Sequence, residues 1–290
     1  MRVGYHGVNQ LLGGYRDEED RVEQKVVLSD GAEAMVTVDD FTDPWSTAEV
    51  ALFLHGNAES GAAWYAWVPA FGRRFRLIRP DMRGFGRSTS MREDYRWTLE
   101  RLVADCVEIL DHMQAARVHL IGAKLGANLA TGLAALHPER VETLTLVGAP
   151  VSLAGLAAGG PPADLVRRHG VEAWARANMA SRLGSAMTAE ALDYWGRFMG
   201  ATPVSSQLSF MRDIQAFEVR DLLPRVEAPT LIITAEGSGI ATTEQTRQLA
   251  ARFRDGRVKV IPSDSYHIAV SDADLCASLA LEFIATVTAG

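Results

Sequence analysis

Two glycines, Gly122 and Gly126, bracket the point where an apolar strand pattern gives way to a helical one. Residues 118–121 form a short run of strand character, and small and aliphatic side chains at residues 127–130 begin a helix. Glycine tolerates the close approach and the unusual backbone angles of a sharp turn. Such a turn projects its central side chain, here Lys124, toward whatever binds there. We call residues 122–126 the elbow.

Strand and helix patterns alternate along most of the chain. Residues 23–28 and 33–39 flank a Ser-Asp-Gly turn signal and predict a hairpin. Further strands are predicted from apolar runs at residues 50–54, 75–78, 118–121, 143–147, 230–234 and 258–261. Helices are predicted at about residues 64–71, 97–113, 127–137, 243–253 and 273–287. This order is typical of an α/β fold, a mostly parallel sheet flanked by helices on both faces.

The alternation stops after residue 150 and resumes at residue 230. Residues 151–216 contain helical patterns rich in Ala, Trp and Met, which predict an inserted helical cap over the carboxyl edge of the sheet. The predicted organisation is a lead-in at residues 1–22, an α/β core at residues 23–150 and 217–290, and the cap at residues 151–216.

Composition excludes several classes of partner. The net charge is −7 with scattered basic residues, so nucleic acid is not an expected ligand. No apolar stretch is long enough to cross a membrane, and the first twenty residues lack signal-peptide character. Cys106 and Cys276 lie in helical patterns without a pairing signature, which favours a reducing, cytoplasmic location. We expect a small-molecule substrate, no metal and no other cofactor, and leave the oligomeric state open, a homodimer included.

Three motifs in order resemble those of the α/β-hydrolase superfamily, in its capped lactonase-like, dehalogenase-like and esterase-like branch. They are a Leu-His-Gly-Asn turn at residues 54–57, a D-x-R-G-x-G-x-S segment at residues 81–88, and the elbow. The resemblance covers nearly everything from residue 23 onward. It implies an α/β-hydrolase fold with Lys124 in place of the nucleophilic serine.

The resemblance also implies the remaining site residues. The backbone N–H groups of Asn57 and Leu125 would form the oxyanion hole, and His267 would be the catalytic histidine. The position of the family's acid holds Ser238, while Glu236 in a flanking position is a candidate acid. Two of the three catalytic positions therefore differ from those of a serine hydrolase.

Lysine in water has a pKa of about 10.4 and is a poor nucleophile while protonated. Burial lowers that value and frees the amine for imine formation or proton transfer. With the acid position neutral, we expect Lys124 to have no buried counter-ion and His267 to move protons. The predicted function is a cofactor-independent enzyme acting on a small carbonyl, ester or lactone-like substrate by hydrolase or lyase-type chemistry.

Three alternatives remain open at this point. A non-catalytic, ligand-binding pseudo-hydrolase would pair Lys124 with a carboxylate such as Asp81 or Glu236. Lys124 would otherwise be a fixed cation that holds a substrate carboxylate, or a substitution that silences a serine hydrolase.

Other residues near these motifs have two interpretations each. Trp64, Trp174 and Trp195 are candidates for the substrate pocket, with core packing as the alternative. Glu59 is expected on the surface near the mouth of the cavity.

Overall fold

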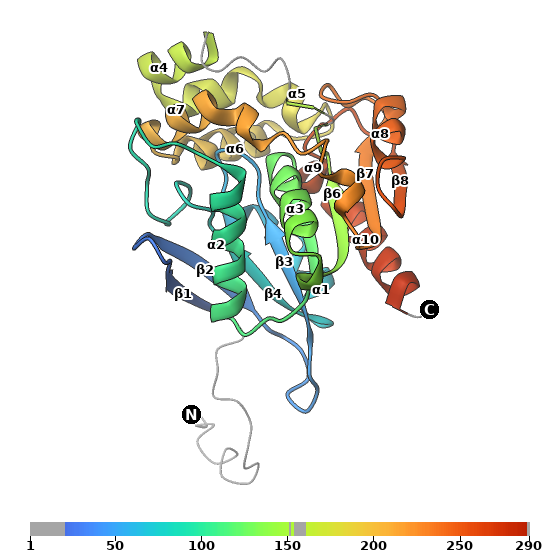
Figure 1. Cartoon of the computed structure of the whole chain (residues 1–290). Coiled ribbons are helices and arrows are strands. Elements are labelled where there is room, and N and C mark those ends of the chain that lie inside the picture. The colour runs from blue at the N-terminus through green and yellow to red at the C-terminus, as the bar shows by residue number, and fades with distance from the viewer. Residues whose placement is uncertain (1–20, 151, 154–160, 289–290) are drawn as a thin grey trace, which may run out of the picture.

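The computed structural model describes residues 21–150, 152–153 and 161–288, and shows one sheet with helices on both faces and a helical layer above one edge (Figure 1). Most of the predicted lead-in therefore lies outside the described residues. The eight strands are β1 (Arg21–Val27), β2 (Glu33–Asp39), β3 (Glu49–Leu54), β4 (Phe75–Pro80), β5 (Val118–Ala123), β6 (Val141–Val147), β7 (Thr230–Ala235) and β8 (Gly256–Ile261).

The strand order is β1-β2-β4-β3-β5-β6-β7-β8. β1 pairs with β2 and β2 with β4 in antiparallel fashion, as the predicted hairpin requires. All other neighbours are parallel. The carboxyl ends of β3, β5 and β8 therefore lie at one edge of the sheet, where ligands of open α/β sheets bind.

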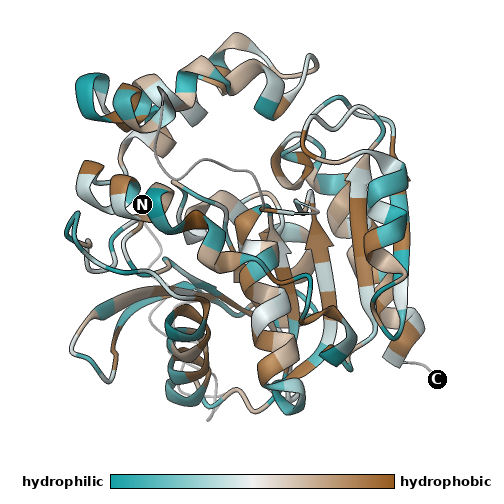
Figure 2. Ribbon diagram, turned by 45° about the horizontal axis from the view of Figure 1, so that its top comes forward, coloured by the Kyte–Doolittle hydropathy of each residue, from teal (hydrophilic) through white to brown (hydrophobic). Residues whose placement is uncertain are grey.

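The burial of the strands agrees with their sequence patterns. Every residue of β5 and of β7 is buried, whereas exposed and covered residues alternate along the edge strand β8. Figure 2 shows the same contrast, with largely brown strands inside a shell of helices that mix brown and teal. Continuous apolar runs are the pattern of strands covered on both faces.

Two apolar clusters fill the space between the sheet and its helices. On one face, α2 and α3 pack with α8 against the strands, and on the other face α1 and α10 do so. The helical elements are η1 (Gly61–Trp64), α1 (Val68–Phe71), α2 (Leu99–His112), α3 (Leu125–Leu136), η2 (Pro138–Arg140), α4 (Pro161–Ala177), α5 (Met179–Leu183), α6 (Ala189–Gly200), α7 (Val204–Asp213), η3 (Ile214–Phe217), η4 (Leu223–Arg225), α8 (Thr243–Ala250), α9 (Ile268–Ser271) and α10 (Ala273–Thr288).

The helix predicted at residues 64–71 is instead two short elements, η1 and α1. Pro69 occupies the first turn of α1, where its missing N–H costs nothing, but it prevents one continuous helix across the segment. Trp64 and Trp67 flank the break, and both pack on Phe53 of β3.

Helices α4 to α7 form the inserted layer between β6 and β7, drawn in yellow-green to orange above the sheet in Figure 1. They share an apolar cluster of their own that includes Ala58 and Ala63 from the segment after β3. Two hydrogen bonds fasten α7 to the core: Met91 N–H donates to Ser206 Oγ (2.8 Å), and Trp97 Nε1 donates to Ser209 Oγ (3.0 Å). The inserted helical layer therefore packs directly on the loop that contains Asn57.

Candidate active site

The elbow joins β5 to α3 through one strained residue. Lys124 has φ 53° and ψ −119°, a backbone conformation that is costly for a residue with a Cβ. A Cβ on Gly122 would collide with the backbone of Gly126 and Ala127, and one on Gly126 would collide with the carbonyl groups of residues 54 and 55. The two glycines let α3 approach β3 and β5 closely, which holds the side chain of Lys124 at the carboxyl edge of the sheet.

The ammonium group of Lys124 is buried and paired with a carboxylate. Its Nζ donates to Oε1 of Glu59, and both side chains are almost inaccessible, at 8% and 1% exposure. Gly56 forms the floor beneath them, since a Cβ at that position would overlap Lys124 Cε. The expectation that Lys124 has no buried counter-ion is therefore wrong.

Glu59 occupies the site because the chain turns back immediately after Asn57. Ala58 adopts a positive φ of 57°, and the Glu59 side chain then folds under the turn, where Oε2 accepts a hydrogen bond from Gly56 N–H (3.0 Å). The surface position expected for Glu59 is also wrong. The carboxylate that pairs with Lys124 is neither Asp81 nor Glu236.

His267 contacts the same carboxylate oxygen. It follows β8 and is held by its backbone N–H, which donates to Ser265 Oγ (2.9 Å) and to the carbonyl oxygen of Arg182 (3.0 Å). Its Nε2 lies 3.0 Å from Glu59 Oε1 without the geometry of a hydrogen bond, and its buried Nδ1 also has no hydrogen-bond partner among the described residues. Lys124, Glu59 and His267 thus form one contiguous cluster, which we call the Lys–Glu–His cluster.

Among the described residues, no carboxylate takes the place of the family's acid on Nδ1 of His267. Ser238 is only partly buried, and the side chain of Glu236 is exposed and has no ion pair in the described chain. Glu236 follows Ala235, the last residue of the buried strand β7, and lies where the chain leaves the sheet. The structure therefore gives no support to Glu236 as an acid.

Burial dominates the ionisation of the cluster. It lowers the pKa of Lys124 to about 8; the Glu59 carboxylate opposes this shift and the positive charge of Arg182 adds to it. Burial also lowers the pKa of His267 to about 4, against the attraction of Glu59. For Glu59, burial raises the pKa, but His267 and Lys124 outweigh it and the pKa falls well below its usual value. At neutral pH the cluster therefore contains mostly ammonium, carboxylate and neutral imidazole.

The two backbone donors of the expected oxyanion hole are available. The N–H groups of Asn57 and Leu125 make no hydrogen bond within the described chain, Leu125 being the first residue of α3. The turn around Asn57 is braced by His55, whose Nδ1 lies 2.8 Å from Gly56 O and whose Nε2 accepts from Met82 N–H (2.9 Å). An oxygen that gains negative charge could bind between these amides.

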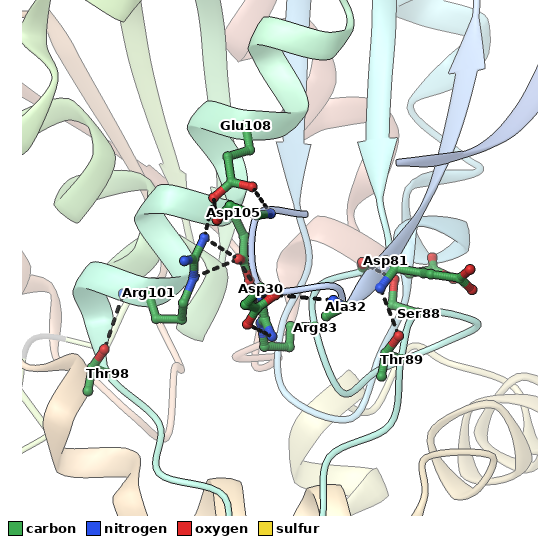
Figure 3. A network of polar contacts seen from close by, with 12 residues as sticks. Asp30, Ala32, Asp81, Arg83, Ser88, Thr89, Thr98, Arg101, Asp105 and Glu108 are labelled. Carbon is green, nitrogen blue, oxygen red and sulfur yellow. Dashed lines mark hydrogen bonds and ion pairs between the residues drawn. The ribbon is translucent and has the colours of Figure 1, made fainter. Parts of the chain in front are cut away.

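The D-x-R-G-x-G-x-S segment braces the loops around the site (Figure 3). Asp81 accepts from the backbone N–H groups of Gly61 and Arg87, each at 2.8 Å. The Arg83 guanidinium pairs with Asp105 of α2 (2.7 Å) and with Asp30 of the first hairpin (2.7 Å). These contacts tie three separate segments together and leave Asp81 and Arg83 with structural roles.

The three tryptophans lie in different surroundings. Trp195 of α6 packs its ring 5.6 Å from that of His267, centroid to centroid, and so covers the site. Trp174 of α4 faces the guanidinium of Arg182. Trp64 lies in the core cluster beneath η1, with its ring 5.1 Å from that of Phe53. Core packing is the role that these contacts give Trp64.

Two further findings concern metal binding and membrane crossing. Within residues 21–288 as far as they are described, no group of three His, Cys, Asp or Glu side chains is arranged to hold a metal ion. None of the helices in the described segments combines the length and the apolar character that a bilayer crossing requires.

Comparison with known proteins places the chain in a family. Residues 50–274 match the family model of the alpha/beta hydrolase fold. The chain is 28% identical over 255 residues to a putative carbamate hydrolase, RutD, of Variovorax paradoxus, a match that covers 83% of this chain and 93% of that protein. Epoxide hydrolase B of Mycobacterium tuberculosis is 35% identical over 123 residues, which cover 41% of this chain but only 33% of that protein.

The fold is also that of solved hydrolase structures. The enol-lactonase of Burkholderia xenovorans superposes with a TM-score of 0.80 at 23% identity, covering 90% of this chain and 100% of that one. Because the family model spans most of the sequence and the sheet with its flanking helices has the arrangement of that fold, the chain belongs to the alpha/beta hydrolase fold family.

Proposed function

We propose that the protein is a cofactor-independent enzyme that uses Lys124 for general acid–base chemistry on a small carbonyl, ester or lactone-like substrate. The observation that carries this proposal is the Lys–Glu–His cluster, in which a lysine with a pKa of about 8 stands at the elbow. A group titrating near neutral pH is suited to both taking and giving a proton. Names of hydrolases among the relatives support the substrate class.

The reaction begins with the neutral form of Lys124. Its amine removes a proton from the carbon next to the substrate carbonyl, the C–H electrons form a C=C bond, and the carbonyl oxygen takes the negative charge. The N–H groups of Asn57 and Leu125 stabilise that oxygen, an effect worth ~3–4 kcal/mol per donor in comparable sites. Glu59 stabilises the ammonium that forms. Return of the proton to another atom of the substrate completes an isomerisation or the loss of a leaving group.

Hydrolysis follows from the same arrangement if Lys124 takes its proton from water instead. The hydroxide equivalent then attacks the carbonyl carbon, and the ammonium protonates the leaving alcohol. His267 contributes in both cases as a neutral imidazole beside the carboxylate, with Nε2 3.0 Å from Glu59 Oε1. The cluster does not favour imine formation at Lys124, because Glu59 stabilises the protonated form.

The test compares Lys124→Met with Lys259→Met, an exposed lysine on β8. Proton exchange next to the carbonyl in D2O, followed by NMR over a panel of ketones, keto acids, esters and lactones, reports proton abstraction; the same spectra report hydrolysis. We expect turnover that rises with pH through about 8 in the wild type and in the control, and none in Lys124→Met. Equal turnover in both variants would refute a role for Lys124.

A second candidate function is ligand binding without catalysis. The observation that favours it is the buried ion pair, because the Lys124 ammonium is already paired with Glu59. In that case no compound of the panel would be converted, and Lys124→Met would retain ligand binding. Borohydride treatment with a carbonyl compound gives a further check, since the sequence contains only three lysines and an adduct at Lys124 is readily located by peptide mass spectrometry.

A further inference from the structure

Arg182, in the short helix α5, is a buried cation without an anionic partner among the described residues. Arg182 is 6% exposed, and its Nε makes no hydrogen bond within the part of the chain that the structure describes. The guanidinium carbon lies 5.3 Å from the ring centre of Trp174 and 5.5 Å from that of Tyr266. Within the described chain, no carboxylate lies within 4.0 Å of this guanidinium.

The other buried arginines of the described chain are satisfied differently. Arg79 pairs with Asp39 at 2.7 Å, and Arg83 pairs with Asp105 and Asp30. An unpaired buried charge destabilises a protein by several kcal/mol. A buried cation without a partner therefore favours the binding of a ligand that carries a negative charge.

Arg182 is also attached directly to the active site. Its carbonyl oxygen accepts hydrogen bonds from His267 N–H (3.0 Å) and from Ser265 Oγ (2.8 Å). Its charge is among the causes that lower the pKa of both Lys124 and His267. The guanidinium thus lies within electrostatic reach of the Lys–Glu–His cluster.

The charged groups of the site carry a net positive charge, which also favours an anionic ligand. Lys124 and Arg182 each contribute +1 and Glu59 contributes −1, which leaves +1 for these three groups at neutral pH. A substrate with one negative charge would neutralise it. Within the described chain the guanidinium of Arg182 contacts two aromatic rings and makes no hydrogen bond, so its N–H groups are available for a bidentate contact with a carboxylate.

We propose that Arg182, held by Trp174 and Tyr266, binds a carboxylate group of the ligand, so that the substrate is a carbonyl compound that also carries a carboxylate. The assignment of the carbonyl rests on the function proposed for Lys124, whereas binding of the carboxylate does not require turnover. Arg182 then determines specificity, and the Lys–Glu–His cluster acts on the other end of the molecule.

The experiment measures binding by calorimetry and by ligand-induced shifts in melting temperature. The probes are pyruvate, levulinate and 5-oxohexanoate, each compared with its methyl ester; the series varies the distance between carbonyl and carboxylate. We expect the wild type to bind at least one acid about 10- to 100-fold more tightly than its ester, as a charged hydrogen-bonded pair provides. Arg182→Met abolishes this preference, while the exposed control Arg168→Met retains it.

Two further results separate this proposal from others. Lys124→Met should retain the preference for the acid, so failure of the proposed catalysis does not remove the proposed binding. Arg182→Met without ligand should melt at the same or a higher temperature than the wild type, because it removes an unpaired buried charge; a purely structural arginine would lower it. No preference in the wild type, or one that persists in Arg182→Met, would overturn the proposal.

Discussion

Replacement of Glu59 by glutamine tests the ionisation of the active site most directly. Glu59→Gln keeps the size of the side chain and a hydrogen-bonding group but removes the negative charge beside Lys124. Breaking a buried ion pair by removal of one partner costs ~3–5 kcal/mol of folding free energy. Lys124 limits this loss by releasing its proton, so we expect its pKa to fall below the wild-type value of about 8.

The loss of stability depends on pH in a defined direction. The wild-type pKa of Lys124 is lower in the folded than in the unfolded chain, so unfolding takes up a proton and stability rises as pH increases above about 8. In the variant this rise begins at a lower pH. Each unit by which the variant's pKa lies below that of the wild type adds about 1.4 kcal/mol of destabilisation at low pH, and this part disappears above pH 8.

Urea denaturation at pH 6 and pH 9 measures both quantities. We expect Glu59→Gln to be destabilised by about 3–5 kcal/mol at pH 6 and by clearly less at pH 9. Glu236→Gln, an exposed carboxylate without an ion pair, serves as the control and should change stability by less than ~0.5 kcal/mol. A variant as stable as the wild type at pH 6, or equally destabilised at both pH values, contradicts the assignment of a charged, buried pair.

Three more substitutions probe the site and its supports. Lys124→Ser leaves Glu59 opposite His267 without an acid on Nδ1, so hydrolysis of p-nitrophenyl acetate should stay at the level of Lys124→Ala; strong turnover would identify a serine hydrolase silenced at this position. Gly56→Ala forces Lys124 away from Glu59, so turnover should be lost, and urea denaturation should record the ~3–5 kcal/mol of a broken buried pair in addition to the overlap of the new Cβ. Asp105→Asn should cost ~3–5 kcal/mol in the same assay, because it removes a buried partner of Arg83, whereas Asp30→Asn, at a 40% exposed side chain, should cost ~1 kcal/mol or less.

The parts of the fold that could be predicted are those fixed by local pattern. The apolar run of β5 and the helical spacing of α2 reflect burial on both faces of a sheet and on one face of a helix. The elbow is predictable from two glycines at a strand-to-helix junction, and the structure gives the reason, because a Cβ on either glycine would overlap backbone atoms. The helix at residues 64–71 was predicted as one element because periodicity alone does not reveal the break that Pro69 introduces.

The parts of the site that escaped prediction depend on long-range packing. Glu59 reaches Lys124 only because Ala58 takes a left-handed backbone conformation. A glycine in the sequence would indicate such a conformation, but an alanine does not. A carboxylate two residues after the oxyanion turn was the available signal. Arg182 belongs to no motif, and its burial depends on aromatic rings from α4 and from the loop before α9.

The shared burial of Lys124 and Glu59 also restricts how such a site can change over generations. A serine at position 124 would leave the carboxylate of Glu59 without its cation, and a neutral residue at position 59 would leave the ammonium of Lys124 without its anion. Either single step passes through a less stable molecule. The two positions are therefore coupled in stability, and a change at either one alone requires a stability reserve large enough to tolerate an unpaired buried charge.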